Sequence, residues 1–473
     1  MSASQALSAA IILAAGEGTR MRSSKPKVLH ELAGKTFLNR VMDSVRQLEP
    51  GIMGLVVRYQ GERVAQAARS YDPAVSVIQQ DEIPGTGRAV QCALNALEGH
   101  VDPKGRVLIV ASDMPLLDAG TLRDLVDQHV RLGDGATILT TRLDDPTGYG
   151  RIIRDQDGQV LRIVEQKDAT GTELAVTEVN TSVYVFELDV LTQAIAGLNN
   201  RNEQGEFYLT DALEAARRLG RVGAYPAPDP LSVEGVNDRV QLAHLAKAHN
   251  RRVCERWMRE GVTILDPETT WIDDEARIGR DATILPGCFL QGGTRIADEA
   301  VIGPYTTLID AEVGQGATVE RSRVQGSVIG PKATIGPWTY LRPGNELAEG
   351  TKVGAFVEMK KASIDKGTKV PHLSYVGDAH IGEGSNVGGG TITANYDGVH
   401  KNRTEIGAGV HVGAGNMLVA PVHVGDGVTT GAGAVIRHTV PDGAMVYSEN
   451  SQHVVENWKP AWERGAGSGA DSE

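Results

Sequence analysis

In the second half of the chain, aliphatic residues recur at every sixth position, with small, polar or turn-prone residues between them. A period of six matches neither the 3.6-residue repeat of an α-helix nor the two-residue alternation of a half-buried strand. A fixed period kept over most of roughly two hundred residues is typical of a repeat architecture. The repeated positions are Ile272, Ile278, Ile284, Leu290, Ile296, Ile302 and Leu308; then Ile329, Ile335, Leu341, Leu347, Val353 and Met359; then Ile406, Val412, Leu418 and Val424 and, after a polar Thr430, Ile436.

This period predicts a chain that coils around a narrow core. Each six-residue unit supplies one short strand and one turn, with the aliphatic side chain pointing inward and Gly, Asn or Asp at the turn. Because a single coil cannot bury its own aliphatic residues, stability must come from stacking the coils by parallel strand pairing. The alternative is a Gly-rich disordered array, which is disfavoured because disorder does not require an aliphatic residue at each sixth place.

The first half alternates short apolar runs with amphipathic stretches. Expected strands are Ala10–Ala15, Gly54–Arg58, Val75–Gln79, Val107–Ala111, Ala136–Thr140 and Val183–Phe186, and expected helices are Leu38–Leu48, Glu62–Ser70, Ala89–Leu97, Thr121–Leu132 and Leu209–Arg218. This alternation predicts an α/β domain with a mostly parallel, Rossmann-like sheet and helices on both faces. In such sheets, ligands bind at the carboxyl ends of the strands.

These patterns divide the chain into four segments. We expect residues 1–236 to form the sheet domain, 237–261 a connecting helix, 262–459 the coil and 460–473 a disordered tail rich in Gly, Ser and Ala. Asn237 or Asp238 can cap the helix and Gly261 can end it. The expected apolar edge of this helix consists of Val240, Leu245, Val253 and Trp257.

Composition narrows the functional classes. At 473 residues the chain has room for at least two domains, and its formal charge of −13 disfavours unspecific nucleic-acid binding, so a phosphorylated ligand needs a local basic cluster. Three scattered cysteines, Cys92, Cys254 and Cys288, argue against a disulfide framework and fit a reducing compartment. The apolar run Ala9–Ala15 is too short for a signal core or a membrane span. We therefore expect a soluble, cytoplasmic protein.

A first candidate site follows the first expected strand. The segment Leu13-Ala-Ala-Gly-Glu-Gly-Thr-Arg-Met21 is followed by Arg22, Lys25 and Lys27. Its glycines let backbone N–H groups approach a phosphate, and the basic residues supply local positive charge. The segment lacks the third glycine of the dinucleotide fingerprint, because Met21 stands there, and it lacks the Gly-Lys-Ser/Thr of the Walker loop. Alone, it could equally be a plain βα turn with exposed basic residues.

With its surroundings, the segment resembles the signature of the sugar-nucleotide pyrophosphorylases. The resemblance is carried by Leu13 to Met21, Pro26-Lys27-Val-Leu, Gln80, Gly85-Thr86, Asp113, Gly148-Tyr-Gly150-Arg, Glu165, Asn180-Thr181 and Glu234-Gly-Val-Asn237. These enzymes join a nucleoside triphosphate to a sugar 1-phosphate and release pyrophosphate. The residues that the resemblance assigns to UTP and the nucleotide-sugar product are Leu13, Ala14, Ala15, Gly16, Gly18, Arg20, Lys27, Gln80, Gly85, Thr86, Gly150, Glu165, Asn180 and Asn237.

The same resemblance implies an in-line attack of the sugar phosphate on the α-phosphorus of UTP. It also implies Mg²⁺ on Asp113 and Asn237, with Arg20 and Lys27 stabilising the released pyrophosphate. Judged alone, Asp113 could as well cap a helix after its strand, and Asn237 could serve as the helix cap named above.

A second group of polar residues interrupts the six-residue period. Arg342 and Lys360 are three six-residue units apart, so a three-sided coil would stack them on one face. Stacked cations repel unless an anion lies near them, and a sugar phosphate is a natural guest. In this coil His372 falls near Lys360, Tyr375 and Asn386, and an imidazole can take a proton from an attacking amine near neutral pH. The alternatives are a solvated basic patch and a merely structural or exposed histidine.

The period resembles the hexapeptide-repeat family of left-handed parallel β-helices, which commonly form trimers with acyl-transfer sites between subunits. Nearly the whole chain is similar to the bacterial bifunctional N-acetylglucosamine-1-phosphate uridylyltransferase/glucosamine-1-phosphate N-acetyltransferases, including the loop Thr393-Ala-Asn395-Tyr396-Asp397-Gly with Lys401. This implies acetyl transfer from acetyl-CoA to glucosamine 1-phosphate, then uridylyl transfer, in a homotrimer that supplies cell-wall precursors. The resemblance makes His372 the general base. It implies that the acetyl acceptor is bound by Arg342, Lys360, Tyr375 and Asn386. It implies that acetyl-CoA is bound by Gly389, Asn395, Tyr396, Lys401, Ala414 and Ala432.

The chain also departs from that family. Arg88 stands where relatives often have His, and Ala111-Ser112 stands where many relatives have Tyr-Gly. Glu449 lies near the position where a coenzyme-binding Arg is expected. Ala394 stands where some relatives have Cys, and Ala414 stands where some have Ser. Two rival hypotheses are a single-activity sugar-1-phosphate nucleotidylyltransferase with a structural coil, and a coil that serves only as a trimerisation scaffold. The polar residues that break the period argue against both rivals.

Overall fold

The structure is a computed structural model that describes residues 7–449, 452–460 and 462. The chain forms two compact units, Met1–Glu255 with Ile272–Asp274, and Arg256–Trp271 with Glu275–Glu473. Of the expected tail, 461 and 463–473 lie outside the described residues. None of the helices in the described part is both long and apolar enough to span a membrane.

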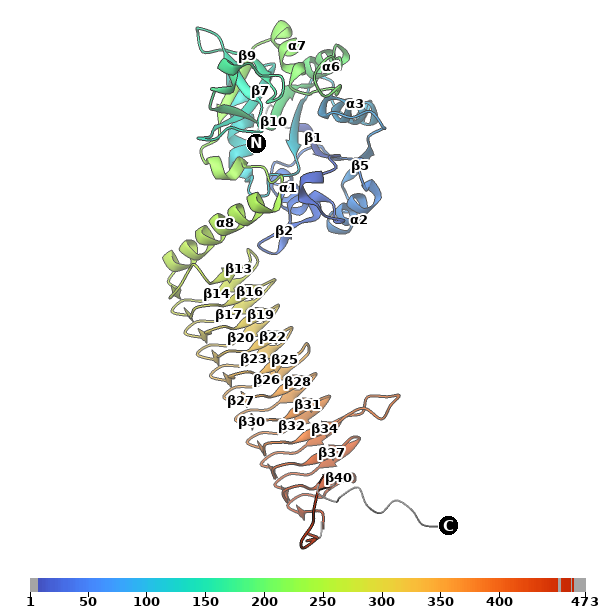
Figure 1. The fold of residues 1–473 in the computed structure, drawn as a ribbon, viewed down its shortest axis with the longest axis vertical. Coiled ribbons are helices and arrows are strands. Elements are labelled where there is room, and N and C mark those ends of the chain that lie inside the picture. Colours follow the sequence, from blue (N-terminus) through green and yellow to red (C-terminus); the bar gives the residue numbers. More distant parts are fainter. Residues whose placement is uncertain (1–6, 450–451, 461, 463–473) are drawn as a thin grey trace. The chain divides into compact units, whose positions relative to one another are not determined.

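The first unit is built on one mixed sheet with the strand order β11-β7-β10-β6-β1-β4-β5, to which β8 and β9 are added beside β10 (Figure 1). The strands are β1 (Leu7–Ala14), β4 (Ile52–Val57), β5 (Ser76–Gln79), β6 (Arg106–Ala111), β7 (Ala136–Arg142), β8 (Arg151–Arg154), β9 (Val160–Val164), β10 (Glu178–Glu187) and β11 (Val222–Pro226). Pairing is parallel for β1 with β4 and β6, β4 with β5, and β7 with β11, whereas β10 runs antiparallel to β6 and β7. The six expected strands are all present.

Helices cover both faces of this sheet, because successive buried residues of β1 point to opposite sides. Ala10 and Ile12 pack into the core beneath α1, α2 and α4, while Ala9 and Ile11 pack into the core beneath α3, α6 and α7. The helices are α1 (Phe37–Arg46), α2 (Gly61–Tyr71), α3 (Thr86–Leu97), α4 (Ala119–Leu132), α5 (Gly171–Leu174), α6 (Leu188–Ala196) and α7 (Asp211–Leu219), with 3₁₀ turns η2 (Thr19–Met21), η3 (Lys27–Leu29) and η4 (Pro230–Val233) and a small hairpin β2 (Glu31–Leu32) and β3 (Lys35–Thr36). The sequence did not predict α5, α6, β8, β9 or β11.

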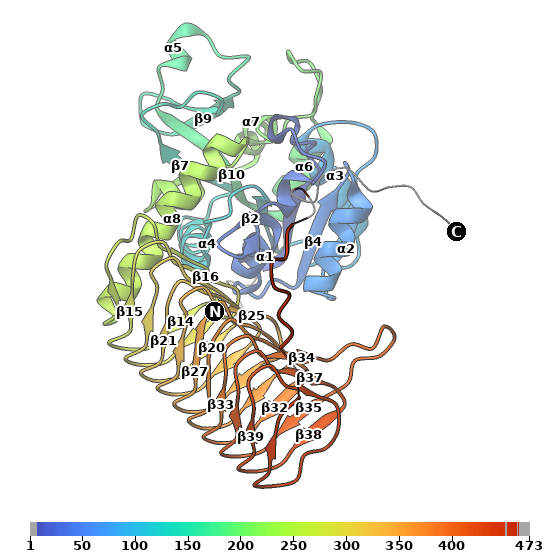
Figure 2. The same ribbon diagram turned by 60° about the horizontal axis from the view of Figure 1, so that its bottom comes forward.

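The second unit is a coil of short strands that stack into three parallel sheets (Figures 1 and 2). The first sheet contains β12 (Thr263–Ile264), β15 (Thr283–Ile284), β18 (Val301–Ile302), β21 (Thr318–Val319), β24 (Thr334–Ile335), β27 (Lys352–Ala355), β30 (Lys369–His372), β33 (Asn386–Val387), β36 (His411–Val412), β39 (Thr429–Thr430) and β41 (Met445–Val446). The second contains β13 (Trp271–Ile272), β16 (Phe289–Gln291), β19 (Thr307–Ile309), β22 (Arg323–Gln325), β25 (Tyr340–Leu341), β28 (Glu358–Lys360), β31 (Tyr375–Gly377), β34 (Ile392–Ala394), β37 (Met417–Val419) and β40 (Val435–Ile436). The third contains β14 (Arg277–Ile278), β17 (Arg295–Ile296), β20 (Glu312–Val313), β23 (Val328–Ile329), β26 (Glu346–Leu347), β29 (Ser363–Ile364), β32 (Ala379–Ile381), β35 (Thr404–Ile406) and β38 (Val422–Val424).

The predicted aliphatic positions line the core of this coil. Every one of them is buried, and so is Thr430. Where the six-residue count breaks, the chain still supplies an inward aliphatic residue, as at Val313, Val324 and Ile364, after a unit that is one residue shorter. The sheets therefore continue without interruption across the breaks.

The long helix that the sequence predicted after the sheet domain is α8 (Arg239–Arg259). Three of its four expected apolar residues, Leu245, Val253 and Trp257, are buried. The expectation for Val240 was wrong, because this side chain is 79% exposed. Val240 lies in the first turn of the helix, at the end of the apolar pattern, where one apolar residue does not show which face is buried.

Candidate active sites

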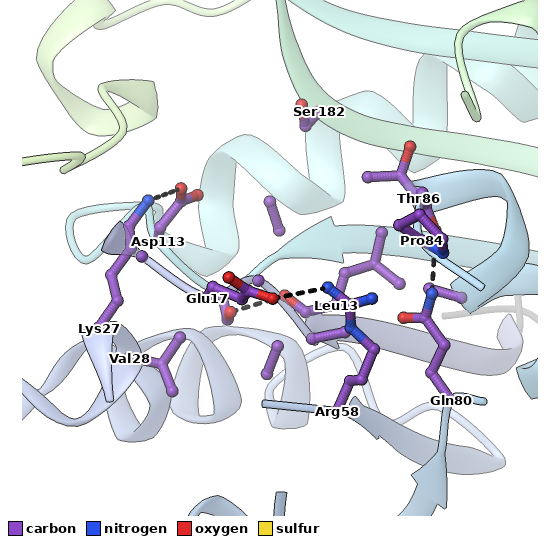
Figure 3. A pocket seen from close by; sticks show the side chains of 18 of the residues that line it. Leu13, Glu17, Lys27, Val28, Arg58, Gln80, Pro84, Thr86, Asp113 and Ser182 are labelled. Carbon is purple, nitrogen blue, oxygen red and sulfur yellow. Dashed lines mark hydrogen bonds and ion pairs between the residues drawn. The ribbon is translucent and has the colours of Figure 1, made fainter. Parts of the chain in front are cut away.

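A cavity of about 680 Å³ in the first unit opens at the carboxyl ends of β1 and β6 (Figure 3). Nine of the residues expected to bind nucleotide line it together with Asp113, Ala111 and Ser112: Leu13, Ala14, Ala15, Gly16, Gly18, Lys27, Gln80, Gly85 and Thr86. A parallel sheet brings the ends of neighbouring strands to one edge, which is where this cavity lies.

The loop after β1 is shaped by Gly18 and Lys27. Gly18 has φ of +61°, a left-handed conformation that favours glycine, and a Cβ there would lie 2.6 Å from Cβ of Lys27. The loop can therefore turn closely against the segment that carries Lys27. The lysine stem packs along the loop, and its ammonium group points toward Asp113 (Figure 3).

A second segment closes the other side of the cavity. Gly85 has φ of +118°, and a Cβ there would collide with the backbone of Phe207. The side-chain amide of Gln80, which is 3% exposed, donates to the carbonyls of Ile83 at 2.8 Å and Gly85 at 3.3 Å. Thr86 Oγ1 accepts from the backbone of Leu209 at 3.0 Å. Gln80, Gly85 and Thr86 are thus fixed on one rigid edge of the cavity.

The two expected metal ligands are brought together by basic side chains. Lys27 Nζ donates to Asp113 Oδ2 at 2.6 Å and to Asn237 Oδ1 at 3.0 Å, and Arg20 donates to Asn237 Oδ1 at 2.9 Å. One cationic nitrogen thus contacts an oxygen of each expected ligand. Carboxylate and amide oxygens are the donors that hard divalent cations prefer. The donor set therefore fits a divalent metal that shares both side chains.

A smaller cavity of about 160 Å³ adjoins this cluster. It is lined by the remaining expected residues of the first site, Arg20, Gly150, Glu165, Asn180 and Asn237, and it shares Asp113 and Ser182 with the larger cavity. Burial raises the pKa of Glu165, whose Oε1 accepts from Thr210 at 3.3 Å. Asn180 donates to Tyr184 at 2.7 Å. Polar groups that converge on a compact space suit the hydroxyl groups of a sugar.

Two departures from the family pattern have local structural roles. Ser112, in place of the Gly of many relatives, donates from Oγ to the carbonyl of Leu13 at 2.6 Å and so joins the ends of β6 and β1. Arg88 forms a two-pronged ion pair with Asp81 beside Gln80. Neither residue blocks the cavity.

In the coil, the register stacks Arg342 and Lys360 on one face. Leu341 pairs with Met359, and Arg342 N donates to Met359 O at 2.8 Å, which sets the next residues, Arg342 and Lys360, side by side. Lys401 reaches the same place from the loop after β34, and this neighbouring ammonium lowers the pKa of Lys360. Positive charge is therefore concentrated at one spot, as expected of a phosphate-binding site.

His372 ends β30 at the corner between the first and second sheets of the coil. A Cβ on Gly389 would lie 2.5 Å from Cδ2 and 2.7 Å from Nε2 of His372, so this glycine stands directly against the imidazole. In the next coil, Gly415 N donates to Gly389 O at 2.8 Å. In the coil after that, Gly433 N donates to Ala414 O at 2.8 Å. Gly389, Ala414 and Ala432 therefore form a column of small residues that begins at His372.

The expected acceptor residues are only partly gathered within one chain. Tyr375 pairs with Glu358 in the second sheet, which also contains Lys360. The hydroxyl of Tyr375 lies over Gly377, the residue that pairs with Lys360, so closely that a Cβ on Gly377 would collide with it. Asn386 instead pairs with Lys369, three positions before His372. Asn386 therefore does not lie opposite His372 in the next coil, and Gly389 occupies that position. Glu449 is exposed near the end of the described coil.

The loop between β34 and β35 leaves the coil and returns to it (Figures 1 and 2). Asn395, at its start, is 8% exposed, whereas Tyr396 is 61% exposed. Tyr396 and Lys401 form an antiparallel bridge across the loop. The loop therefore exposes an aromatic ring and brings the cation of Lys401 next to Lys360.

Comparison with known proteins assigns both halves to recognised families. Residues 10–169 match the model of the MobA-like NTP transferase domain, and residues 403–438 match the bacterial transferase hexapeptide model of six repeats. "Bifunctional protein GlmU" of Bifidobacterium longum strain NCC 2705 is 73% identical over 461 residues, which cover 97% of this chain and all of that protein. The chain belongs to the GlmU family.

Other GlmU relatives agree. The "Bifunctional protein GlmU" of Pseudarthrobacter chlorophenolicus and that of Clavibacter sepedonicus are each 50% identical over 454 residues, covering 96% of this chain and 92% of the relative. The family membership expected from the sequence is thereby confirmed. So is the fold class, an α/β nucleotidyltransferase domain with a mostly parallel sheet followed by a left-handed parallel β-helix of hexapeptide repeats.

Several residues at these GlmU sites were not predicted from the sequence. Arg58 lies 3.5 Å from Glu17 in the wall of the larger cavity, and Ser182, with φ of +62°, lines both cavities of the first unit (Figure 3). Ser182 directly follows Asn180-Thr181, so its neighbours were the available signal. Tyr149, which belongs to the Gly148-Tyr-Gly150 segment named in the resemblance, also lines the smaller cavity. For Arg58 no signal existed beyond its position after a strand.

Proposed function

We propose that this chain catalyses two consecutive reactions in the synthesis of UDP-N-acetylglucosamine. The coil transfers the acetyl group of acetyl-CoA to the amine of glucosamine 1-phosphate. The sheet domain then joins the N-acetylglucosamine 1-phosphate to UTP and releases pyrophosphate. The observation that carries this proposal is that the chain has two separate groups of polar residues, one at Lys27 and Asp113 and one at Lys360 and Lys401, and matches a GlmU relative over 97% of its length.

For uridylyl transfer, the two adjoining cavities divide the substrates. The larger cavity takes UTP, with the uracil against Gln80 and Gly85 and the phosphates along the loop of Gly16 and Gly18. The smaller cavity takes the sugar, with hydroxyl groups near Glu165 and Asn180. The shared wall at Asp113 is then the place where the phosphate oxygen of the sugar attacks the α-phosphorus. The protein contributes positioning and charge neutralisation rather than covalent chemistry.

Mg²⁺ is the metal we propose for Asp113 and Asn237. It favours oxygen ligands, commonly takes one or two protein side chains, and completes its coordination with substrate phosphates and water. When bound, it would supply positive charge to the phosphates during the displacement. Lys27 and Arg20, which lie within hydrogen-bonding distance of these ligands, provide the protein's own charge toward the departing pyrophosphate.

For acetyl transfer, the corner at His372 supplies the base. The imidazole accepts a proton from the attacking amine of glucosamine 1-phosphate, the amine nitrogen bonds to the acetyl carbon, and the bond to the coenzyme sulfur breaks. The phosphate of the acceptor is held by the cations of Arg342 and Lys360. The narrow column of Gly389, Ala414 and Ala432 leaves room for the extended arm of the coenzyme beside His372.

A trimer formed through the coil is part of the proposal. Tyr305, Trp338, Phe356 and Leu373 stand on the same corner of the coil and are 65%, 56%, 58% and 61% exposed, and Arg321 occupies that corner between Tyr305 and Trp338. The rings of Trp338 and Phe356 stack at 5.3 Å between centroids. The exposed apolar stripe of Trp338, Phe356 and Leu373 marks an association surface, and a second copy of the chain is the natural partner. Because Leu373 directly follows His372, the neighbouring copy would complete the pocket with residues such as Asn386.

The single-activity alternative leaves the second site without a purpose. Incubation of the chain with glucosamine 1-phosphate, acetyl-CoA, UTP and Mg²⁺ should yield UDP-N-acetylglucosamine, free coenzyme A and pyrophosphate. Omission of acetyl-CoA should stop this product. Formation of pyrophosphate from UTP and N-acetylglucosamine 1-phosphate without any acetyl transfer would instead favour the single-activity enzyme. Absence of both reactions would refute the proposal.

A further inference from the structure

Asp378 occupies a special position in the coil. It follows β31 in a left-handed conformation with φ of +49°, which is uncommon for a residue with a side chain. Its backbone N–H donates to the carbonyl of Lys360 at 2.9 Å, so it stands one coil beyond the cationic cluster. The conformation turns the residue out of the strand pattern, toward the loop that follows β34.

Asp378 holds both ends of that loop. Its carboxylate accepts from the side-chain amide of Asn395 at 2.5 Å, where the loop begins, and its carbonyl accepts from Thr404 N at 3.1 Å, where the loop ends. Both loop residues are well shielded, since Asn395 is 8% exposed and Thr404 is fully buried. A hydrogen bond to an ionised group in a shielded place is among the stronger ones in proteins.

The loop itself is closed by its own hydrogen bonds. Asn402 N donates to Asn395 O at 2.7 Å, and the carboxylate of Asp397 accepts from the backbone of Val399 at 2.8 Å and His400 at 2.6 Å. Such a loop moves as one piece, so its placement depends on how its two ends are attached. Asp378 makes both attachments described above, and the end of the loop has one further bond, from Val422 N to Arg403 O at 3.4 Å.

We infer that Asp378 is a positioning residue for acetyl transfer, which fastens the 395–403 loop so that Tyr396 and Lys401 stand over the acetyl-donor site beside Lys360. The inference rests on the proposed function of that site. Asp378 itself contacts neither substrate. Its carboxylate also lies close enough to Lys360 to offset part of the repulsion between Lys360 and Lys401.

The kinetic test compares Asp378→Ala, Asp378→Asn and the unchanged full-length chain. Asp378→Ala should raise KM for acetyl-CoA about tenfold, because it removes a charge-assisted hydrogen bond that orders the loop, while kcat stays within about twofold. Asp378→Asn keeps an oxygen acceptor for Asn395, so its KM for acetyl-CoA should lie between those of Asp378→Ala and the unchanged chain. Uridylyl transfer should be unchanged in both variants. The matched control is Asp365→Ala, since Asp365 accepts from His380 at 3.1 Å in the third sheet of the coil.

A second readout does not depend on catalysis. Lys401 and Arg403 are exposed cleavage sites for trypsin within the loop. Asp378→Ala should speed cleavage at these two positions in the folded full-length chain, and Asp365→Ala should not. If the unchanged chain transfers no acetyl group, the proposed function fails, but this cleavage comparison still tests the fastening.

Unchanged cleavage at Lys401 and Arg403 in Asp378→Ala would overturn the inference, whatever the activity. Faster cleavage together with an unchanged KM for acetyl-CoA would overturn it too, because the loop position would then not matter to the donor. Should Asp378→Ala fail to fold, Asp378→Asn carries the same comparison at smaller amplitude. A rise in KM shared equally by Asp365→Ala would show a general loss of coil structure and would also refute the specific role.

Discussion

Lys27 Nζ lies 2.6 Å from Oδ2 of Asp113. The same nitrogen lies 3.0 Å from Oδ1 of Asn237, so an internal cation already joins the two side chains that we propose as metal ligands. A divalent ion that binds both oxygens must compete with this ammonium group. UTP offers the lysine a new partner in its phosphates, which links metal entry to nucleotide entry.

Lys27→Ala is therefore expected to raise the affinity of the nucleotide-free chain for Mn²⁺ about tenfold, because the competing cation is gone. The same variant should lose uridylyl transfer, since the released pyrophosphate is no longer stabilised. Free Mn²⁺ measured by electron paramagnetic resonance gives the affinity directly. Lys25→Ala is the control, because Lys25 pairs with Glu31 at 3.0 Å. Weaker Mn²⁺ binding by Lys27→Ala would contradict the competition.

Gly389→Ala tests the close packing against His372. The added methyl group would stand 2.5 Å from Cδ2 of the imidazole and must displace it. We expect acetyl transfer to fall about a hundredfold or more, as for a misplaced general base, with uridylyl transfer unchanged. The control is Gly293→Ala, whose Cβ would meet only an ordinary contact at 3.7 Å with Asp310. Normal acetyl transfer by Gly389→Ala would show that His372 does not need its present position.

Glu165 should give the sheet domain a pH-dependent stability. Burial raises the pKa of this carboxyl group above its ordinary value of 4.5, so the folded state holds the proton more tightly than the unfolded state. This contribution is fully present below pH 4.5 and is lost as the pH rises through the raised pKa. Glu165→Gln should flatten the decline of the unfolding midpoint above pH 4.5. Parallel profiles for the two proteins would contradict the raised pKa.

The apolar stripe predicts that charge will break the assembly. Trp338→Asp and Phe356→Asp should each weaken the trimer by about 2 kcal/mol or more, since a buried charge replaces a central aromatic contact. Sedimentation velocity should then show monomers, and acetyl transfer should fall with dissociation. Val328→Asp, at a side chain 43% exposed on the third sheet, is the control. A trimer that survives both aromatic substitutions would place the interface elsewhere.

The elements that the sequence predicted well obey one strong local rule. Buried positions such as Ile284, Leu341 and Val412 repeat because each coil must supply an inward aliphatic residue. Strands β1, β4, β6 and β7 read as apolar runs because both faces of the sheet are covered. Strands β8 and β9 and helix α6 were missed because each is short, with four, five and nine residues. Val240 was misjudged because exposure at a helix start depends on what packs there.

The candidate sites were predictable as sets of residues but not as contacts. The motif around Lys27 gave no sign that its ammonium group bridges Asp113 and Asn237, since those partners are far away in sequence. Asp378 carried no signal at all, because its role depends on a loop residue 17 positions later. Which residue lies opposite His372 in the next coil depends on the strand register. Asn386 could not be placed from the sequence because the register changes wherever a six-residue unit is shortened.

The most direct test of two independent catalytic sites is a paired assay of Asp113→Ala and His372→Ala in the full-length chain. His372→Ala should reduce acetyl transfer by about 10²-fold to 10⁴-fold, the usual contribution of a general base, and leave uridylyl transfer within about twofold. Asp113→Ala should reduce uridylyl transfer at least about a hundredfold through loss of the metal ligand and leave acetyl transfer intact. Loss of both reactions in either variant would contradict the account.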